Sequence, residues 1–170
     1  ASVNPTTGFV TALAAGTTNI TYTVSAGCNN PVSAFQTLTV SPNANAGTAS
    51  GTSPLCIGGS TTYTSNGDAG GVWSSTNALV ATVDPGTGLV TALTAGTTNI
   101  TYTVSTGCNS PVSSFQALTV SPNANAGTVS GTTPLCIGAS ATYTSTGDVG
   151  GTWSSTDPSV ASVNPVSGLV

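Results

Sequence analysis

Short runs in which apolar and polar residues alternate recur along this chain. In residues 97–104, Ile100, Tyr102 and Val104 are apolar and threonines stand between them. Successive side chains of a β-strand point to opposite faces, so this run predicts a strand with one buried face. Further strands are predicted by similar runs at residues 46–50, 60–64, 72–75, 79–83, 88–93 and 113–120.

Turn-forming residues separate these runs. The turn signals are Ser53-Pro54, Asn66-Gly67-Asp68, Gly70-Gly71, Asp84-Pro85-Gly86-Thr87-Gly88, Ala95-Gly96 and Ser110-Pro111. No stretch carries a helical pattern of any length. Seven short strands in about 80 residues are typical of an immunoglobulin-like sandwich. The pattern therefore predicts an all-β fold built from Ig-like β-sandwich modules.

The sequence repeats itself with a period of 80 residues, since residues 1–90 and 81–170 align without a gap and differ at 23 of 90 positions. This period exceeds the roughly 20–50 residues of solenoid units and reaches the size of a small domain. We therefore expect tandem modules that fold individually. We place the module boundaries from the turn at residues 41–45, which precedes the first strand. A complete Ig-like module is then expected at residues 41–120. Residues 1–40 are the C-terminal half of one module and residues 121–170 are the N-terminal half of another.

Two interpretations of the half-modules remain open. In the first, the 170 residues are a window on a longer array of the same module. In the second, the halves of neighbouring molecules complete each other, which would join subunits head to tail by strand exchange. Both predict that the partners of a module are neighbouring copies of it, in the same chain or in adjacent subunits.

The amino-acid composition limits the functions that this chain can have. The chain has no Lys, Arg, His, Glu or Met, and its four aspartates give a net charge of −4. General acid–base catalysis has almost no groups to use, and phosphate or nucleic-acid binding has no cations. No apolar run approaches the roughly 20 residues of a membrane-spanning helix. We therefore expect no enzyme, no cofactor, no bound metal, no nucleic acid and no membrane insertion in this segment.

The four cysteines Cys28, Cys56, Cys108 and Cys136 are the residues with obvious covalent chemistry. They lack Cys-x-x-Cys spacing and histidine neighbours, so disulfides in an oxidising exterior are predicted rather than zinc or redox sites. A Cys56–Cys108 bridge within one module is one alternative. In a sandwich, however, these cysteines would sit near opposite poles, beyond the Cα separation of about 7 Å that a bridge permits. A bridge between modules is therefore the other alternative.

Other candidate site residues have simpler structural interpretations. Trp73 and Trp153 could stack on sugars, but a tryptophan on this strand of a sandwich is usually in the core. Tyr22 and Tyr102 alternate with Ile and Val and are predicted to be core residues. Calcium needs six to eight oxygens, so turn formation is favoured over calcium binding for the aspartates, which are Asp68, Asp84, Asp148 and Asp157.

Residues 73–104 carry a longer pattern: a Trp-Ser-Ser opening, Val-Ala-Thr-Val, Gly-Leu-Val-Thr-Ala, then Ala-Gly-Thr before Ile-Thr. This pattern resembles the bacterial immunoglobulin-like domain of group 2. The remainder of the module, with Leu-Cys-Ile-Gly at 55–58 and Gly-Cys at 107–108, is similar to repeats in large secreted surface and adhesin proteins of Bacteroidota. The resemblance implies stalks or adhesive fibres at a bacterial cell surface and carries over no catalytic residue.

We therefore expect an extracellular structural protein, the repeat of a filament or cell-surface stalk, with lateral contacts between fibres. One alternative is an adhesin whose loops bind a glycan or a protein receptor. Another is a spacer in a secreted polysaccharide-degrading enzyme, whose catalytic domain would lie elsewhere. The turn segments are small and nearly identical between repeats, which favours a shaft over a binding tip.

Overall fold

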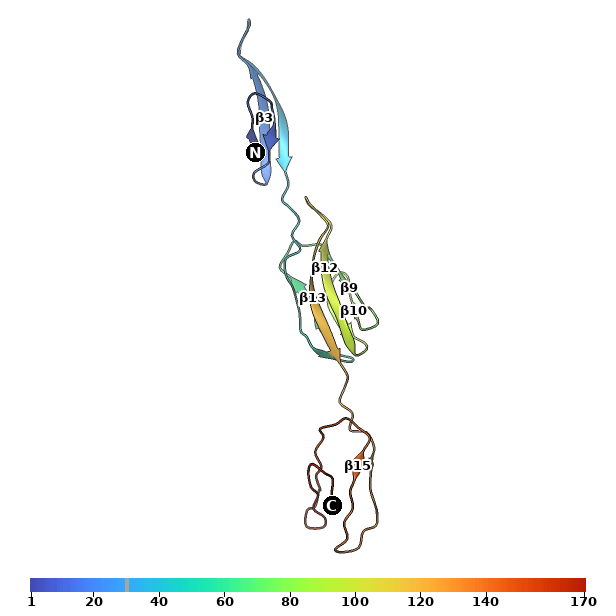
Figure 1. The fold of residues 1–170 in the computed structure, drawn as a ribbon. Helices are drawn as coiled ribbons and strands as arrows, with labels where there is room; N and C mark the ends of the chain where they lie inside the picture. Colours follow the sequence, from blue (N-terminus) through green and yellow to red (C-terminus); the bar gives the residue numbers. More distant parts are fainter. Residues whose placement is uncertain (30) are drawn as a thin grey trace. The chain divides into compact units, whose positions relative to one another are not determined.

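The chain is all-β. The computed structural model describes residues 1–29 and 31–170, and every regular element in them is a strand (Figure 1). The strands are β1 (Ser2–Val3), β2 (Val10–Thr11), β3 (Gly16–Val24), β4 (Val32–Val40), β5 (Ala49–Ser50), β6 (Leu55–Cys56), β7 (Ser60–Thr62), β8 (Thr64–Ser65), β9 (Val72–Ser75), β10 (Ala81–Val83), β11 (Leu89–Ala92), β12 (Gly96–Val104), β13 (Val112–Ser121), β14 (Val129–Ser130) and β15 (Thr144–Ser145).

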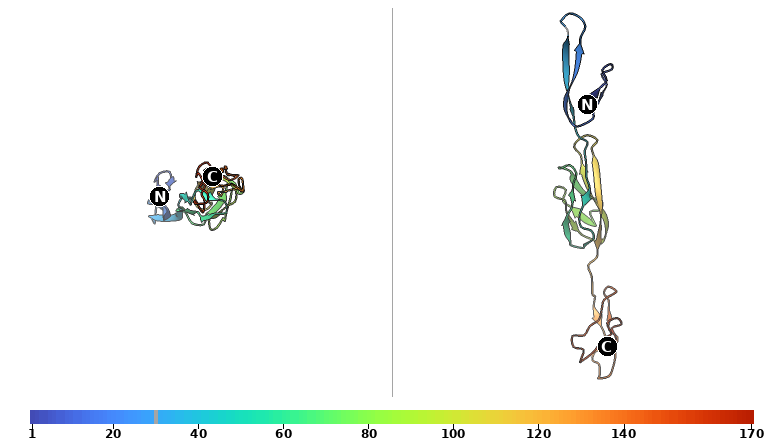
Figure 2. Two further views of the ribbon diagram at one scale, coloured as in Figure 1. Left: turned by 90° about the horizontal axis from the view of Figure 1, so that it is seen from below. Right: turned by 90° about the vertical axis from the view of Figure 1, so that its left-hand side faces the viewer.

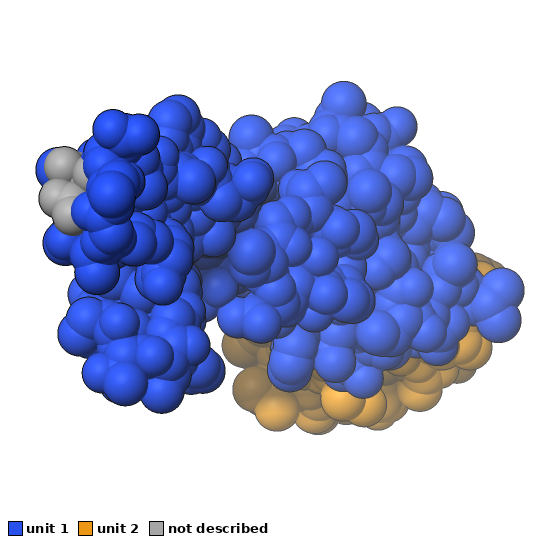
Figure 3. Space-filling view, turned by 90° about the horizontal axis from the view of Figure 1, so that it is seen from above, with its two compact units in different colours: residues 1–121 blue, residues 122–170 orange. Residues whose placement is uncertain are grey.

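The described residues form two compact units, with the boundary between Ser121 and Pro122 (Figure 3). The first unit contains a complete sandwich, here called the sandwich module (residues 41–121), and the segment 1–40, here called the N-terminal half-module. The second unit is the C-terminal half-module (residues 122–170). The predicted domain boundaries at 40/41 and 120/121 stay predictions.

Two sheets build the sandwich module. One has the order β6-β13-β12-β9 and the other the order β10-β11-β7, while β5 and β8 form a separate pair. Nine residues of β12 pair antiparallel with β13, so these two strands lie side by side as a long hairpin (Figure 2). β6 joins the free edge of β13 in parallel. The Ig-like all-β fold predicted from the alternation is confirmed.

The core of the sandwich module follows the predicted alternation. Along β12, Thr98, Ile100, Tyr102 and Val104 are buried and the residues between them are partly exposed. Burial of such side chains supplies most of the stability of a small domain. The buried apolar residues are Ala46, Ala49, Tyr63, Trp73, Val80, Ala81, Val90, Ala92, Ile100, Tyr102, Val104, Leu118 and Val120.

The N-terminal half-module consists of two hairpins, β1–β2 and β3–β4. β3 has the same nine-residue sequence as β12, yet Tyr22 is 75% exposed whereas the equivalent Tyr102 is 8% exposed. The prediction that Tyr22 is a core residue is therefore wrong in this chain. The reason is that β3 pairs only with β4, and no second sheet covers its apolar face among the described residues.

The C-terminal half-module is less regular. It contains the pair β14–β15 and an isolated bridge from Thr142 to Leu169. Residues 152–155 and 135–136, which correspond to β9 and β6 of the sandwich module, form no strand. In the sandwich module those two strands pair with β12 and β13, and the C-terminal half-module has no counterpart of either.

Some predicted strand bounds differ from the structure. The predicted strand 60–64 is divided at Tyr63 into β7 and β8, which belong to different sheets, and the strand predicted at 79–83 begins at Ala81. β6 was not predicted. It has two residues, and its pairing with the distant β13 leaves no local pattern in the sequence.

Candidate functional site

The chain enters the sandwich module at one pole, here called the N-pole. Asn43 forms an isolated parallel bridge with Cys108. The Ala44 N–H donates to the Cys108 carbonyl at 2.8 Å, and the Cys108 N–H donates to the Pro42 carbonyl at 3.2 Å. The turn after β12 therefore holds the incoming segment by its backbone.

The chain leaves the module at the other pole, here called the C-pole. In the parallel pair of β6 and β13, Leu55 lies opposite Val120 and Cys56 opposite Ser121. The Ile57 N–H donates to the Ser121 carbonyl at 3.1 Å. The last residues of the module are thus bonded into the sheet up to Ser121.

The cysteines mark these two poles. Cys108 lies at the N-pole and Cys56 at the C-pole, and all four cysteines of the chain, each among the described residues, are exposed and free. β13, which runs between the poles, has 10 residues and spans about 30 Å at about 3.4 Å per residue. A disulfide needs a Cα separation below about 7 Å, so this fold leaves Cys56 and Cys108 of one module too far apart to bridge.

Asp68 ties the N-terminal segment of the module to the turn after β8. The Asn45 N–H donates to its carboxylate at 2.9 Å, and the Asp68 N–H donates to the Asn45 carbonyl at 2.7 Å. A second bond runs from the Thr48 N–H to Asn66 Oδ1 at 2.7 Å. Asp148 holds Asn125 in the same way, at 2.8 and 2.7 Å. Both aspartates therefore act as structural acceptors inside their own loops.

Asp84 and Asp157 cap turns. The Thr87 N–H at 2.7 Å, the Thr87 hydroxyl at 2.8 Å and the Gly86 N–H at 3.0 Å donate to Asp84. These bonds stabilise the carboxylate and lower the pKa of Asp84 from its ordinary value. The hydroxyl and N–H of Ser159 lower the pKa of Asp157 in the same way. The turn-forming interpretation of these two residues accounts for their bonds.

The Asp84→Asn variant is expected to keep its stability at neutral pH and to resist acid better. A lowered folded-state pKa contributes stability above the unfolded-state pKa and loses it as the pH falls through the folded-state pKa. An asparagine oxygen accepts the same turn bonds without titrating, as Asn4 does from the N–H groups of Thr6 and Thr7 at 3.0 Å. Urea unfolding of both proteins at neutral and acidic pH measures the effect, and equal loss of stability in acid would contradict it.

Aromatic rings fill the centre of the sandwich module. The Trp73 ring lies 4.8 Å from that of Tyr102 and 6.3 Å from that of Tyr63, between ring centroids. The Tyr102 hydroxyl donates to the Asp68 carbonyl at 2.8 Å and accepts from the Gly71 N–H at 2.9 Å. Trp73 is 5% exposed, so it is a core residue and presents no face on which a sugar could stack.

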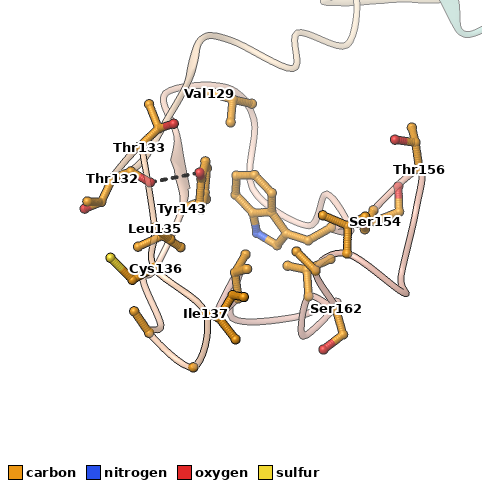
Figure 4. A pocket seen from close by; sticks show the side chains of 18 residues that line it. Val129, Thr132, Thr133, Leu135, Cys136, Ile137, Tyr143, Ser154, Thr156 and Ser162 are labelled. Atoms are coloured by element: carbon orange, nitrogen blue, oxygen red, sulfur yellow. Dashed lines mark hydrogen bonds between the residues drawn. The ribbon is translucent and has the colours of Figure 1, made fainter.

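The C-terminal half-module contains a cavity of about 860 Å³ (Figure 4). Its apolar lining includes Val129, Leu135, Tyr143, Trp153 and Val160. The Tyr143 hydroxyl donates to the Thr132 carbonyl at 3.0 Å at its rim, and the sulfur of Cys136 lies on the outer side of its loop. No charged side chain lines the cavity, so the arrangement offers apolar packing rather than chemistry.

Across residues 1–29 and 31–170, no three His, Cys, Asp or Glu side chains gather where they could hold a metal ion. The same residues include no helix able to span a membrane. Buried side-chain nitrogen and oxygen atoms in this part of the chain all have hydrogen-bond partners, which agrees with a role for these groups in the fold.

The sequence profile of the bacterial Ig-like domain (group 2) matches residues 34–111. The matched span begins within β4 and ends before β13, which are equivalent strands of successive repeats. Among curated proteins no relative matches the chain. The match includes all of residues 73–104 and confirms the resemblance seen there. The chain therefore carries a bacterial Ig-like domain of group 2.

Proposed function

We propose that this chain is a non-catalytic structural segment of an extracellular filament or cell-surface stalk, with Ig-like modules in series. One observation carries the proposal: the sandwich module takes in the chain at the N-pole, beside Cys108, and releases it at the C-pole, beside Cys56. These poles are separated by the length of β13, about 30 Å. A module with this geometry adds its full length each time the repeat recurs.

The family and the composition support this role. Bacterial Ig-like domains of this group occur in surface and extracellular proteins and are typically non-catalytic. The chain has no cationic side chain, so contacts between such fibres would depend little on salt. Hydrogen bonds along the parallel β6–β13 pair lie at the C-pole, where the chain leaves the module, so a pulling force would shear them together.

The candidate binding residues of the sandwich module, Trp73, Asp68 and Asp84, have roles in its fold. Trp73 is buried in the core, and Asp68 and Asp84 accept hydrogen bonds from their own turns. Protein interfaces are typically enriched in aromatic residues that are exposed before binding. This arrangement favours a shaft over the adhesin alternative.

Surface labelling of the cells that make the protein tests the proposed function. Antibodies raised against the whole chain are expected to label intact cells, and electron microscopy should place the label on fibres or stalks outside the envelope. An antibody against a cytoplasmic protein, which should label only permeabilised cells, is the control. Labelling of the chain that appears only after permeabilisation would overturn the proposal.

A further inference from the structure

We infer that residues 43–57 of the sandwich module, here called the entry segment, and the strand β13 form a seam that carries tension along the fibre, with Gln116 as its central residue. The inference rests on the proposed function, in which modules act in series. Tension then enters the module at the N-pole, where the entry segment begins, and leaves it at the C-pole, where β13 ends. A pulling force therefore acts directly on these two segments.

The entry segment and β13 run in the same direction along the module. At the N-pole, Asn43 forms a parallel bridge with Cys108, in the turn that precedes β13. At the C-pole, Leu55 and Cys56 pair in parallel with the end of β13. Because tension pulls the entry segment toward the N-pole and β13 toward the C-pole, the two segments would slide along each other. The bonds between them are then loaded together, in shear, rather than one after another.

Side chains extend the seam from the β6–β13 ladder toward the N-pole. The Ser114 hydroxyl donates to the Ala46 carbonyl at 3.2 Å. Nearer the C-pole, the Thr119 N–H donates to the Ser53 hydroxyl at 3.1 Å. Each contact pairs a later residue of the entry segment with a later residue of β13, so the seam keeps a parallel register along its length.

Gln116 makes the central contact of the seam. Its side-chain amide donates to the Gly51 carbonyl at 3.0 Å and accepts from the Gly51 N–H at 2.8 Å. A primary amide has both a donor and an acceptor, so it can replace the two bonds that a neighbouring strand would supply. Both bonds are partly buried, which strengthens them relative to bonds in water. Sliding of the entry segment along β13 would break both at once.

The core fixes the two sides of this contact. A Cβ at Gly51 would overlap the ring of Tyr63, which is 1% exposed, so glycine lets the entry segment lie directly on the core. The Tyr63 hydroxyl also donates to the Thr52 carbonyl at 3.4 Å. On the other side of the seam, Leu118 and Val120 of β13 are buried in the same core. The seam therefore joins two segments that are each held in place independently.

The central contact recurs in the repeat. Its two residues have identical counterparts, Gln36 and Gly131, whereas the counterpart of Ser114 is Ala34. The pair that recurs is the one that makes two bonds. All groups of the seam are uncharged, so its resistance to tension depends little on the salt concentration.

Single-molecule pulling of the whole chain tests the inference. Peptide tags at the two ends serve as handles, and reductant keeps the four thiols free. Unfolding of the sandwich module should appear as one step that lengthens the chain by about 260 Å, because residues 41–121 extend to about 290 Å and the folded module spans about 30 Å. The quantity measured is the rate of this step at constant force, since forced unfolding is governed by the unfolding rate.

Gln116→Leu is expected to raise the unfolding rate under load by about tenfold or more. Leucine is similar in size but has no polar atom, so the variant loses both bonds to Gly51. Ser53→Ala removes one exposed bond and should raise the rate by a smaller factor, about two- to fivefold. Trp73 fluorescence checks that the sandwich module of each variant is folded.

Thr98→Val is the matched control, because it removes polar bonds that lie outside the seam. The Thr98 hydroxyl bonds to Ser75 Oγ and to the Asn77 N–H, both at 2.9 Å, and so joins β12 to the end of β9. In urea, both this variant and Gln116→Leu should unfold at a lower midpoint. Under load, Thr98→Val should change the rate by less than about twofold, since its bonds are still intact when the seam breaks. Rates under load that change in proportion to the shifts in urea would overturn the inference.

The direction of pulling provides a second test. In a chain with Cys28→Ser, Cys108→Ser and Cys136→Ser, the thiol of Cys56 becomes a handle. Tension between this thiol and the C-terminal tag acts on neighbours at the C-pole, because Cys56 lies opposite Ser121. The seam then opens bond by bond, so the module should unfold at a lower force than when the same chain is pulled by its two ends. Equal forces in the two directions would overturn the inference.

These outcomes are separable from those for the proposed function. A chain that labels the cell surface, but whose unfolding under load depends neither on Gln116 nor on the pulling direction, would overturn the inference and leave the proposed function intact. Labelling restricted to permeabilised cells, with both dependences present, would overturn the proposed function alone.

Discussion

Replacing Ile100 with alanine is expected to lower the free energy of unfolding of the sandwich module by about 2–5 kcal/mol, the usual cost of deleting a large buried aliphatic side chain. Ile100 is 0% exposed and lies on β12 between the buried residues Thr98 and Tyr102. A domain of this size has a total stability of about 4–12 kcal/mol, at about 0.05–0.15 kcal/mol per residue. The substitution therefore removes a large part of that stability.

The chain supplies its own control for this prediction. Ile20 sits in an identical nine-residue strand, but its strand pairs only with β4. Ile20→Ala should leave the unfolding of the sandwich module unchanged, because the residue belongs to the N-terminal half-module. Trp153→Phe in both variants makes Trp73 the only tryptophan, and its fluorescence during urea unfolding of dilute, reduced protein then reports on the sandwich module.

The comparison of Ile100 with Ile20 separates the effect of burial on the free energy of unfolding from the effect of local sequence. Equal effects of the two substitutions would show that the 0% exposure of Ile100 is not what determines its contribution. An effect at Ile100 alone would show that the same strand is stabilising only when a second sheet covers it. This dependence on context is characteristic of β-strands.

The contrast between β12 and β3 also shows which features of the fold can be predicted from the sequence. Alternation predicted β12, its buried face and the Ig-like fold, because burial in a sandwich imposes a period of two on each strand. The exposure of Tyr22 could not be predicted from that pattern, since its strand is identical to β12. Burial of Tyr22 depends on a sheet that the described residues of this chain do not place over it.

The short strand β6 and the contacts between turns could not be predicted from the sequence for a different reason. β6 has two residues and exists through its pairing with β13, about 65 residues away. The bonds between Asn45 and Asp68 join two turns, and turn-forming residues indicate where the chain reverses but not which turns meet. The family pattern in residues 73–104 did predict the fold, because these residues include strands of both sheets.

Gly67 provides the second large expected effect. It lies where the turn after β8 meets the segment that begins the sandwich module, and a Cβ there would overlap the backbone of Asn45, Ala46 and Gly47. Backbone atoms cannot rotate away as a flexible side chain can, so the two segments would have to separate. Their separation would strain the bonds between Asn45 and Asp68. We expect Gly67→Ala to lower the free energy of unfolding by about 3 kcal/mol or more, at the upper end for an overpacked site.

Gly86→Ala is the matched control for this substitution. Neither Gly67 nor Gly86 has a positive φ, and a Cβ at Gly86 would approach only Asp84 Oδ1, at 3.7 Å. The counterparts of Gly86 in the other repeats are Thr6 and Val166, whereas the counterpart of Gly67 is Gly147. Gly86→Ala should therefore change the stability by less than about 0.5 kcal/mol, as exposed substitutions usually do. Urea unfolding followed by Trp73 fluorescence measures both variants. Similar free energies of unfolding would show that the close contact between the two turns does not determine the fold. A large difference would identify that contact as the reason why this position is glycine in both repeats.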